Sequence, residues 1–238
     1  MTVQIFPDYA ALCRAVADRV AETIRHKPKS LICLASGHSP LGVFECLIRD
    51  VHSGNLDISA CEWVGLDEWL GMDGSDPGSC RQMMDEFLFH PLKIMAERIH
   101  FFNGKASDPN READRINNLI SSHGGLDVML VGIGTNGHLA MNEPGTPFSQ
   151  YAHVSKLAAE TISVGQKYFK TPTQLTKGIT LGLADFAEAR LPILMANGVR
   201  KAPIIQRLLN EPAHEQLPAS IVHRIDRALV MVDREAYT

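Results

Sequence analysis

Short apolar runs alternate with helical segments along the whole chain, and this alternation restricts the fold more than any other feature. Residues 30–35, 61–66 and 126–134 read as strands, and their apolar positions are continuous rather than alternating with polar ones. Continuous runs are typical of parallel strands that are covered on both faces. Because helices separate the strands, the sequence predicts a doubly wound α/β fold with a mostly parallel sheet and helices on both faces.

The remaining elements follow the same alternation. Residues 9–27 show helical spacing, with Asp8 as the expected N-cap. Helices are also expected at 43–52, 79–92, 111–125 and 199–210, strands at 98–102, 191–196 and 227–232, and a strand followed by a short helix at 177–189. The signal weakens over residues 147–172, where a mobile flap is expected because long connections are often lids. No linker divides the chain, so one domain over residues 1–238 is expected.

Composition and charge narrow the classes of function. The formal net charge is −4 and no run of Lys or Arg occurs, which argues against nucleic acid or an anionic membrane as a partner. The five cysteines form no Cys-x-x-Cys pair, which favours reduced, buried thiols and a cytoplasmic location. Neither a signal peptide nor an apolar run of about 20 residues is found, so no membrane association is expected.

Three polar loops follow three of the predicted strands. The sequences are "SGHSP" at 36–40, "LDEW" at 66–69 and "GTNGH" at 134–138. Ligands of open parallel sheets bind beyond the carboxyl ends of the strands, so the three loops are expected to share one pocket.

The first loop combines Ser36, Gly37 and Ser39 between a strand and a helix that has Pro40 near its first turn. Backbone N–H groups and the helix dipole make such a turn a phosphate cradle, although it is neither a Walker A loop nor a G-x-G-x-x-G fingerprint. An ordinary capped turn is the alternative interpretation. The motif is too short to distinguish a phosphate cradle from an ordinary turn.

The second loop holds Asp67 and Glu68 at the end of an apolar strand, with Trp63 and Trp69 nearby. A partly desolvated carboxylate there has a raised pKa and suits a general base. An N-cap or a solvated acidic pair is the alternative.

The third loop places Asn136, His138 and Glu143 in a glycine-rich stretch. Glu143 is expected to hydrogen-bond one ring nitrogen of His138 and fix its tautomer, and Asn136 to reach the ring or the substrate. A capping histidine is the alternative. No metal is expected, because one His and one Glu make a thin ligand set.

Taken together, four segments resemble the glucosamine/galactosamine-6-phosphate deaminase (isomerase) family. They are "ICLASGHSPLGVFECL", "LDEWLGMDGSDPGSC", "GGLDVMLVGIGTNGHLAMNEPG" and "KGITLGLADFAEA", in this order, and the resemblance runs over nearly the whole chain. The related 6-phosphogluconolactonases share the fold and the first loops but typically continue toward Ser-Leu-Phe-Pro after the Gly-His pair. Here "LAMNEPG" follows, which resembles the deaminase branch.

The resemblance implies an amino-sugar-6-phosphate deaminase or isomerase that needs no metal or organic cofactor. Asp67 matches the base that moves a proton between C2 and C1 of the opened sugar. His138 matches the residue that assists ring opening, and Glu143 the carboxylate that supports this histidine. The matching phosphate-binding positions are Ser36, Gly37, His38, Ser39, Lys167 and Lys201.

Two positions depart from the family pattern. Asn136 replaces a common aspartate, and an amide stabilises an imidazolium less than a carboxylate does. The galactosamine-type branch tends to show Asn-Gly-His here, which favours galactosamine 6-phosphate as the substrate. Lys167 replaces an arginine and supplies charge without a bidentate fork. The Arg-rich activator-binding signature is missing from 147–172, so regulation by an N-acetylated sugar phosphate is not expected.

Two other functions stay open from the sequence. A lactone hydrolase on the same fold would release no ammonia. A sugar-phosphate sensor usually carries a DNA-binding or partner module, for which this chain has neither spare residues nor a basic patch. The expected partner is a small sugar phosphate. The C4 epimer and the oligomeric state, including a homo-oligomer, are not determined by the sequence.

Overall fold

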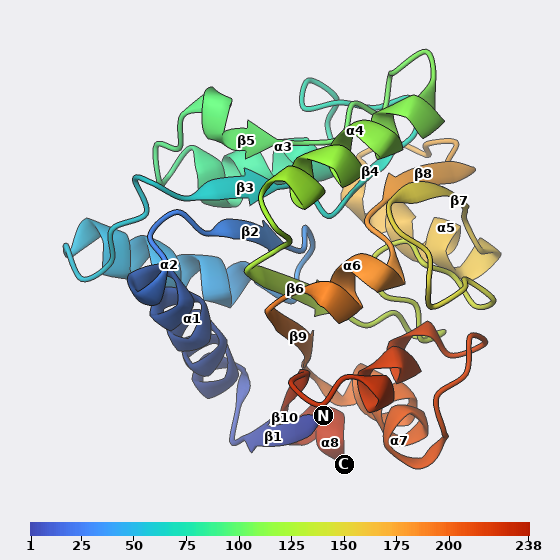
Figure 1. Cartoon of the computed structure of the whole chain (residues 1–238). Helices are drawn as coiled ribbons and strands as arrows, with labels where there is room; N and C mark the ends of the chain where they lie inside the picture. Colours follow the sequence, from blue (N-terminus) through green and yellow to red (C-terminus); the bar gives the residue numbers. More distant parts are fainter.

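The computed structural model describes residues 1–238 and has the predicted doubly wound architecture (Figure 1). The strands of the main sheet are β1 (Thr2–Phe6), β2 (Leu31–Leu34), β3 (Glu62–Val64), β5 (Ile99–His100), β6 (Val128–Gly132), β9 (Leu191–Ala196) and β10 (Leu229–Asp233). All seven are parallel, in the order β1-β10-β9-β6-β2-β3-β5. The chain runs outward from β2 to β5 and then crosses to β6, so the topological switch point lies between β2 and β6.

Helices cover both faces of this sheet (Figure 1). They are α1 (Tyr9–His26), α2 (Leu41–His52), α3 (Cys80–Met84) with a π-helical turn (Asp85–Phe89), α4 (Pro109–Ser122), α6 (Leu183–Glu188), α7 (Ala202–Asn210) and α8 (Arg234–Tyr237). Alternate side chains of β2 enter opposite cores. Ile32 and Leu34 pack with residues of α1 and α2, whereas Leu31 and Cys33 pack with residues of α4, α6 and α7. This two-sided burial explains why the strand is apolar at every position.

A second, three-stranded antiparallel sheet lies beside the first and was not predicted. Its strands are β4 (Asp67–Trp69), β7 (His153–Lys156) and β8 (Lys177–Thr180), in the order β4-β8-β7. The expected strand at 61–66 ends early, as β3, and the chain continues within three residues into β4. Only β8 was expected as a strand, at the start of residues 177–189. Strands β4 and β7 are short and largely polar, so no apolar run indicated them.

Residues 147–172 are more regular than the sequence suggested. They contain β7, the short helix α5 (Ala159–Gly165) and a 3-10 turn (Gln166–Tyr168). The mobility of this segment stays a prediction, and so does the single-domain organisation. All five cysteines are buried and free, as expected. None of the helices combines the length and apolar character that crossing a bilayer requires.

Glu68 joins strand β4 of the second sheet to α3. Its side chain is fully buried, and its carboxylate accepts the backbone N–H groups of Trp69, Cys80 and Arg81 at 2.8 to 2.9 Å. Two of these N–H groups belong to the first turn of α3, where no intrahelical partner exists. Glu68 is therefore a structural residue. Of the two acidic residues of the second loop, Glu68 stabilises the fold and Asp67 lines the cavity.

Replacement of Glu68 by alanine is expected to lower the free energy of unfolding by about 3 kcal/mol, because three buried N–H groups lose their acceptor. Chemical denaturation followed by circular dichroism measures this change. Glu86 is a matched control, because it is exposed and its only hydrogen bond is to Gln82, so Glu86→Ala should change stability by less than about 0.5 kcal/mol. Equal effects of the two substitutions would contradict the assignment.

Candidate active site

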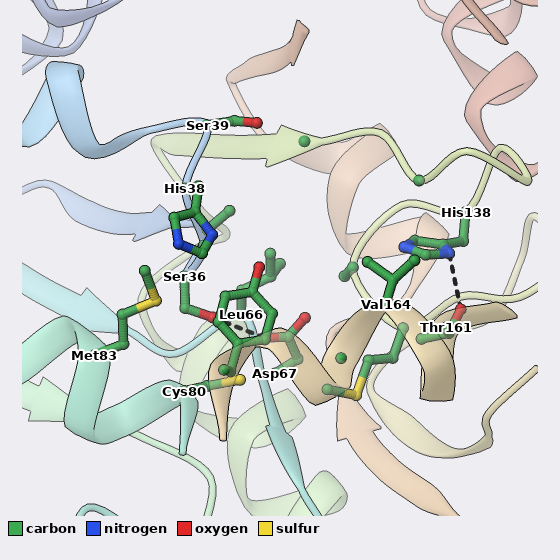
Figure 2. A pocket seen from close by; sticks show the side chains of 18 of the residues that line it. Ser36, His38, Ser39, Leu66, Asp67, Cys80, Met83, His138, Thr161 and Val164 are labelled. Carbon is green, nitrogen blue, oxygen red and sulfur yellow. Dashed lines mark hydrogen bonds between the residues drawn. The ribbon is translucent and has the colours of Figure 1, made fainter. Parts of the chain in front are cut away.

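A cavity of about 220 Å³ opens at the carboxyl edge of the main sheet, where the three predicted loops meet (Figure 2). Eight of the ten residues predicted from the sequence line it: Ser36, Gly37, His38, Ser39, Asp67, His138, Lys167 and Lys201. The other two, Asn136 and Glu143, belong to the same glycine-rich stretch as His138 but do not line the cavity. The expected convergence of the loops is therefore found.

Two tyrosines, Tyr9 and Tyr168, contact the segment that contains the loop at residues 36–39. The Tyr9 hydroxyl donates to the carbonyl oxygen of Ser39 at 2.9 Å and accepts the N–H of Gly42 at 3.0 Å. Gly37 has φ +133°, and a Cβ atom there would approach the Tyr168 hydroxyl at 3.3 Å, so a side chain at this position is doubly disfavoured. The loop leads directly into α2, so the N-terminus of that helix adds partial positive charge near the cavity.

Two cationic side chains, Lys167 and Lys201, line the cavity together with this loop. Burial lowers the pKa of Lys201 and the nearby Lys167 lowers it further, while burial and Arg200 lower the pKa of Lys167. The Lys201 ammonium donates to the carbonyl oxygen of Ile133 at 2.6 Å. Like charges that depress one another's pKa are stabilised by an anion between them. This end of the cavity is therefore suited to a phosphate group.

Asp67 lies at the floor of the cavity and is only 8% exposed. Its carboxylate accepts a hydrogen bond from the Ser36 hydroxyl at 3.4 Å (Figure 2). The Cys80 thiol lies beside it and lowers its pKa as a donor to the charged form. Burial raises the pKa of Asp67 to about 6, and it raises the pKa of the Cys80 thiol well above its usual range, so the thiol stays protonated and able to donate. A carboxylate with a pKa near 6 matches the requirement for a general base that works near neutral pH.

His138 faces Asp67 and His38 from the opposite side of the cavity (Figure 2). Its ring lies against Gly134, where a Cβ atom would be less than 3.0 Å from three ring atoms, so glycine is required at that position. Burial lowers the pKa of His138 below its ordinary value, although the charge of Glu143 acts in the opposite direction. The ring is therefore a neutral imidazole near neutral pH, able to accept a proton.

Asn136 and Glu143 are arranged differently from the expectation. The Asn136 amide donates to Glu143 Oε2 at 2.9 Å, and its oxygen accepts the backbone N–H of His138 at 3.1 Å, so it reaches neither the ring nor the cavity. Glu143 Oε1 accepts the N–H of Ala158 at 3.1 Å, and Oε2 stays 3.7 Å from His138 Nδ1. Thr161 Oγ1 contacts that nitrogen instead, at 3.2 Å. Both Glu143 oxygens accept N–H groups of other residues, and neither is within hydrogen-bond distance of the ring.

Three residues of the site were missed by the sequence analysis: Cys80, Thr161 and Tyr168. Cys80 begins α3 directly after its N-cap Ser79, and a helix-start signal at that point could have brought it toward the loop edge. The Tyr168 ring stacks on His38 with ring centroids 5.3 Å apart, and no pattern in the surrounding residues indicates this contact. Thr161 lies in the region of weak signal, and nothing in its local sequence singles it out.

The comparison with protein families agrees with this geometry. The family model described as "Glucosamine-6-phosphate isomerases/6-phosphogluconolactonase" matches residues 8–231. The chain belongs to this family. A glucosamine-6-phosphate deaminase of Geobacillus sp. (strain WCH70) is 34% identical over 230 residues, which cover 96% of this chain and 92% of the relative. The putative deaminase AgaI of Escherichia coli (strain K12) is 34% identical over 222 residues, covering 93% and 87%.

Solved structures show the same fold. A monomeric glucosamine-6-phosphate deaminase of the NagB superfamily superimposes with a TM-score of 0.96 at 33% identity, covering 99% of this chain and 98% of the other. The 6-phosphogluconolactonase of Trypanosoma brucei gives a TM-score of 0.78 at 20% identity, covering 99% and 97%, which shows the likeness of fold alone.

The imidazole of His138 is expected to titrate below the ordinary value of 6.5, because burial disfavours its charged form. Replacement of Glu143 by glutamine removes a charge that favours imidazolium, so the pKa should fall further in that variant. Both values can be measured by NMR titration of the imidazole protons, with His138→Gln to assign the signal. A pKa above 6.5, or a rise in the Glu143→Gln variant, would contradict the account of the site.

Proposed function

We propose that this protein is an amino-sugar-6-phosphate deaminase that converts a 2-amino-2-deoxyhexose 6-phosphate into a ketose 6-phosphate and ammonia. The observation that carries the proposal is the pairing of a buried carboxylate, Asp67, with a neutral imidazole, His138, across one cavity that also holds a group of cations. The names of the full-length relatives at 34% identity support the same class of substrate.

The proposed reaction begins at the ring oxygen of the bound sugar. His138 transfers a proton as the pyranose opens, and Asp67 then removes the proton from C2 to give an enolamine. Reprotonation at C1 gives a ketimine, which water hydrolyses to the ketose 6-phosphate and ammonium. The C1 carbonyl of the opened sugar takes up the electron pair of the C2–H bond, and the nitrogen lone pair then supplies electrons for protonation at C1, so Asp67 and His138 need only move protons.

The phosphate group is proposed to bind at the other end of the cavity. The loop at residues 36–39 offers backbone N–H groups and the hydroxyls of Ser36 and Ser39, and Lys167 and Lys201 supply charge. An anchored phosphate holds C1 and C2 in one place relative to the acid and the base, which lowers the entropic cost of the reaction.

Galactosamine 6-phosphate is the proposed preferred epimer, on the basis of the "NGH" sequence at 136–138. The comparisons include relatives named for glucosamine 6-phosphate, so both epimers belong in the assay. Residues of one chain bring together the acid, the base and the cations that the proposed chemistry uses.

The assay that tests the proposal measures ammonia together with fructose or tagatose 6-phosphate from each amino-sugar phosphate. Release of ammonia and ketose in equal amounts is expected with at least one epimer. Release of ammonia with neither would overturn the proposal. Hydrolysis of 6-phosphogluconolactone without ammonia would point to the lactonase branch of the family, and binding without turnover to a sensor.

Replacement of Asp67 by asparagine is expected to lower kcat by about 100-fold or more, because the base that removes the C2 proton is lost. The phosphate contacts are untouched, so binding of the substrate, measured by calorimetry, should change little. Near-normal turnover in Asp67→Asn would show that another group is the base.

The acid limb of the pH profile of kcat/KM is expected near pH 6, where Asp67 gains a proton and ceases to be a base. The Cys80 thiol lowers the pKa of Asp67 by donating to the charged form. Cys80→Ala should therefore move the acid limb to higher pH, whereas Cys80→Ser keeps a donor and should not. An unchanged limb in Cys80→Ala would show that the thiol has no influence on the base.

A further inference from the structure

Thr161 is the only side chain hydrogen-bonded to the ring of His138 (Figure 2). It is the third residue of α5 and is 7% exposed, and its hydroxyl oxygen lies 3.2 Å from Nδ1. A threonine side chain has few χ1 rotamers, so the direction of its hydroxyl is well defined by the helix. The opposite ring nitrogen, Nε2, points away from Thr161 toward the cavity (Figure 2).

The surroundings of Nδ1 favour a proton on that nitrogen. Glu143 Oε2 lies 3.7 Å away on the same side of the ring, and both oxygens of Glu143 accept N–H groups, as a carboxylate ion does. A negative charge beside Nδ1 stabilises the tautomer with its proton there. Thr161 Oγ1 then accepts that proton in a hydrogen bond, and the lone pair of Nε2 is left free.

We propose that Thr161 is a positioning residue that holds His138 as the Nδ1–H tautomer and thereby presents an unprotonated Nε2 to the cavity. Thr161 acts through His138 and does not itself need to contact the sugar. The inference rests on the proposed function where it concerns catalysis, because only in that reaction does Nε2 take a proton during ring opening. The tautomer itself is a property of the protein alone.

Helix α5 makes both contacts that matter to this arrangement. The N–H of Ala158, at the N-cap of the helix, binds Glu143, and Thr161 binds the ring three residues later. The first turn of α5 therefore positions the carboxylate and the imidazole relative to each other. The Thr135 hydroxyl adds a hydrogen bond to Glu160 of the same turn.

The experiment uses the full chain, labelled with 15N-histidine, without ligand. Long-range 1H–15N correlation NMR distinguishes a protonated ring nitrogen from an unprotonated one, and His138→Gln assigns the signal among the ten histidines. Wild type and Thr161→Ser should show the Nδ1–H tautomer of His138. Thr161→Val, which keeps the shape but lacks the hydroxyl, should shift the population toward the Nε2–H tautomer.

Ser163→Ala is the matched control, because Ser163 is exposed on the same helix and has no hydrogen bond to the site. It should leave the tautomer as in wild type. An Nε2–H tautomer in the wild-type protein, or no change in a folded Thr161→Val variant, would overturn the proposal. Should Thr161→Val fail to fold, Thr161→Ala, which also lacks the hydroxyl, is measured in its place and should show the same shift.

Turnover provides a separate readout. With an active amino-sugar phosphate, kcat/KM should fall roughly ten-fold in Thr161→Val, the scale of one lost hydrogen bond, and return close to wild type in Thr161→Ser. A tautomer that changes as expected in a protein that turns over no amino sugar would reject the proposed function and leave the positioning role of Thr161 intact. Normal turnover in a Thr161→Val variant with the altered tautomer would reject its importance for catalysis.

Discussion

The position of β2 between β3 and β6 is the constraint on which the rest of the site depends. Ile32 pairs with Trp63 on one side and with Val128 on the other, so three neighbouring strands end at one edge of the sheet. The loops that follow them must converge there whatever their own sequences are. A fully buried strand whose own side chains do not line the cavity thus decides which reactive groups of other segments meet.

The enclosed cavity changes the proton affinities of its acid and its base in opposite directions. Burial raises the pKa of Asp67 from 3.8 to about 6 and lowers the pKa of His138 from 6.5. Both changes have the same cause, since an environment of low polarity disfavours whichever form is charged. The two groups, whose pKa values lie far apart in water, are therefore shifted toward each other, which favours proton transfer to and from a sugar held between them.

The apolar pattern was sufficient to locate the three loops, because long buried runs leave few alternative arrangements. It could not reveal β4, since Asp67–Trp69 gains strand geometry only by pairing with β8. The contact of Thr161 with His138 could not be predicted either, because no local sequence rule relates a threonine to a histidine 23 positions earlier. The orientation of Asn136 depends on which donors already occupy Glu143, and that is known only once α5 is in place.

Asn136 also affects the proton balance of the loop that carries His138. Its amide donates to a Glu143 carboxylate whose second oxygen accepts the Ala158 N–H. An aspartate at position 136 could take the same place only by sharing a proton with Glu143, because two facing carboxylates repel each other. The amide supplies its N–H at every pH. The pairing between positions 136 and 143 therefore needs no shared proton while Glu143 is ionised, whereas a pair of carboxyl groups would have to hold one between them.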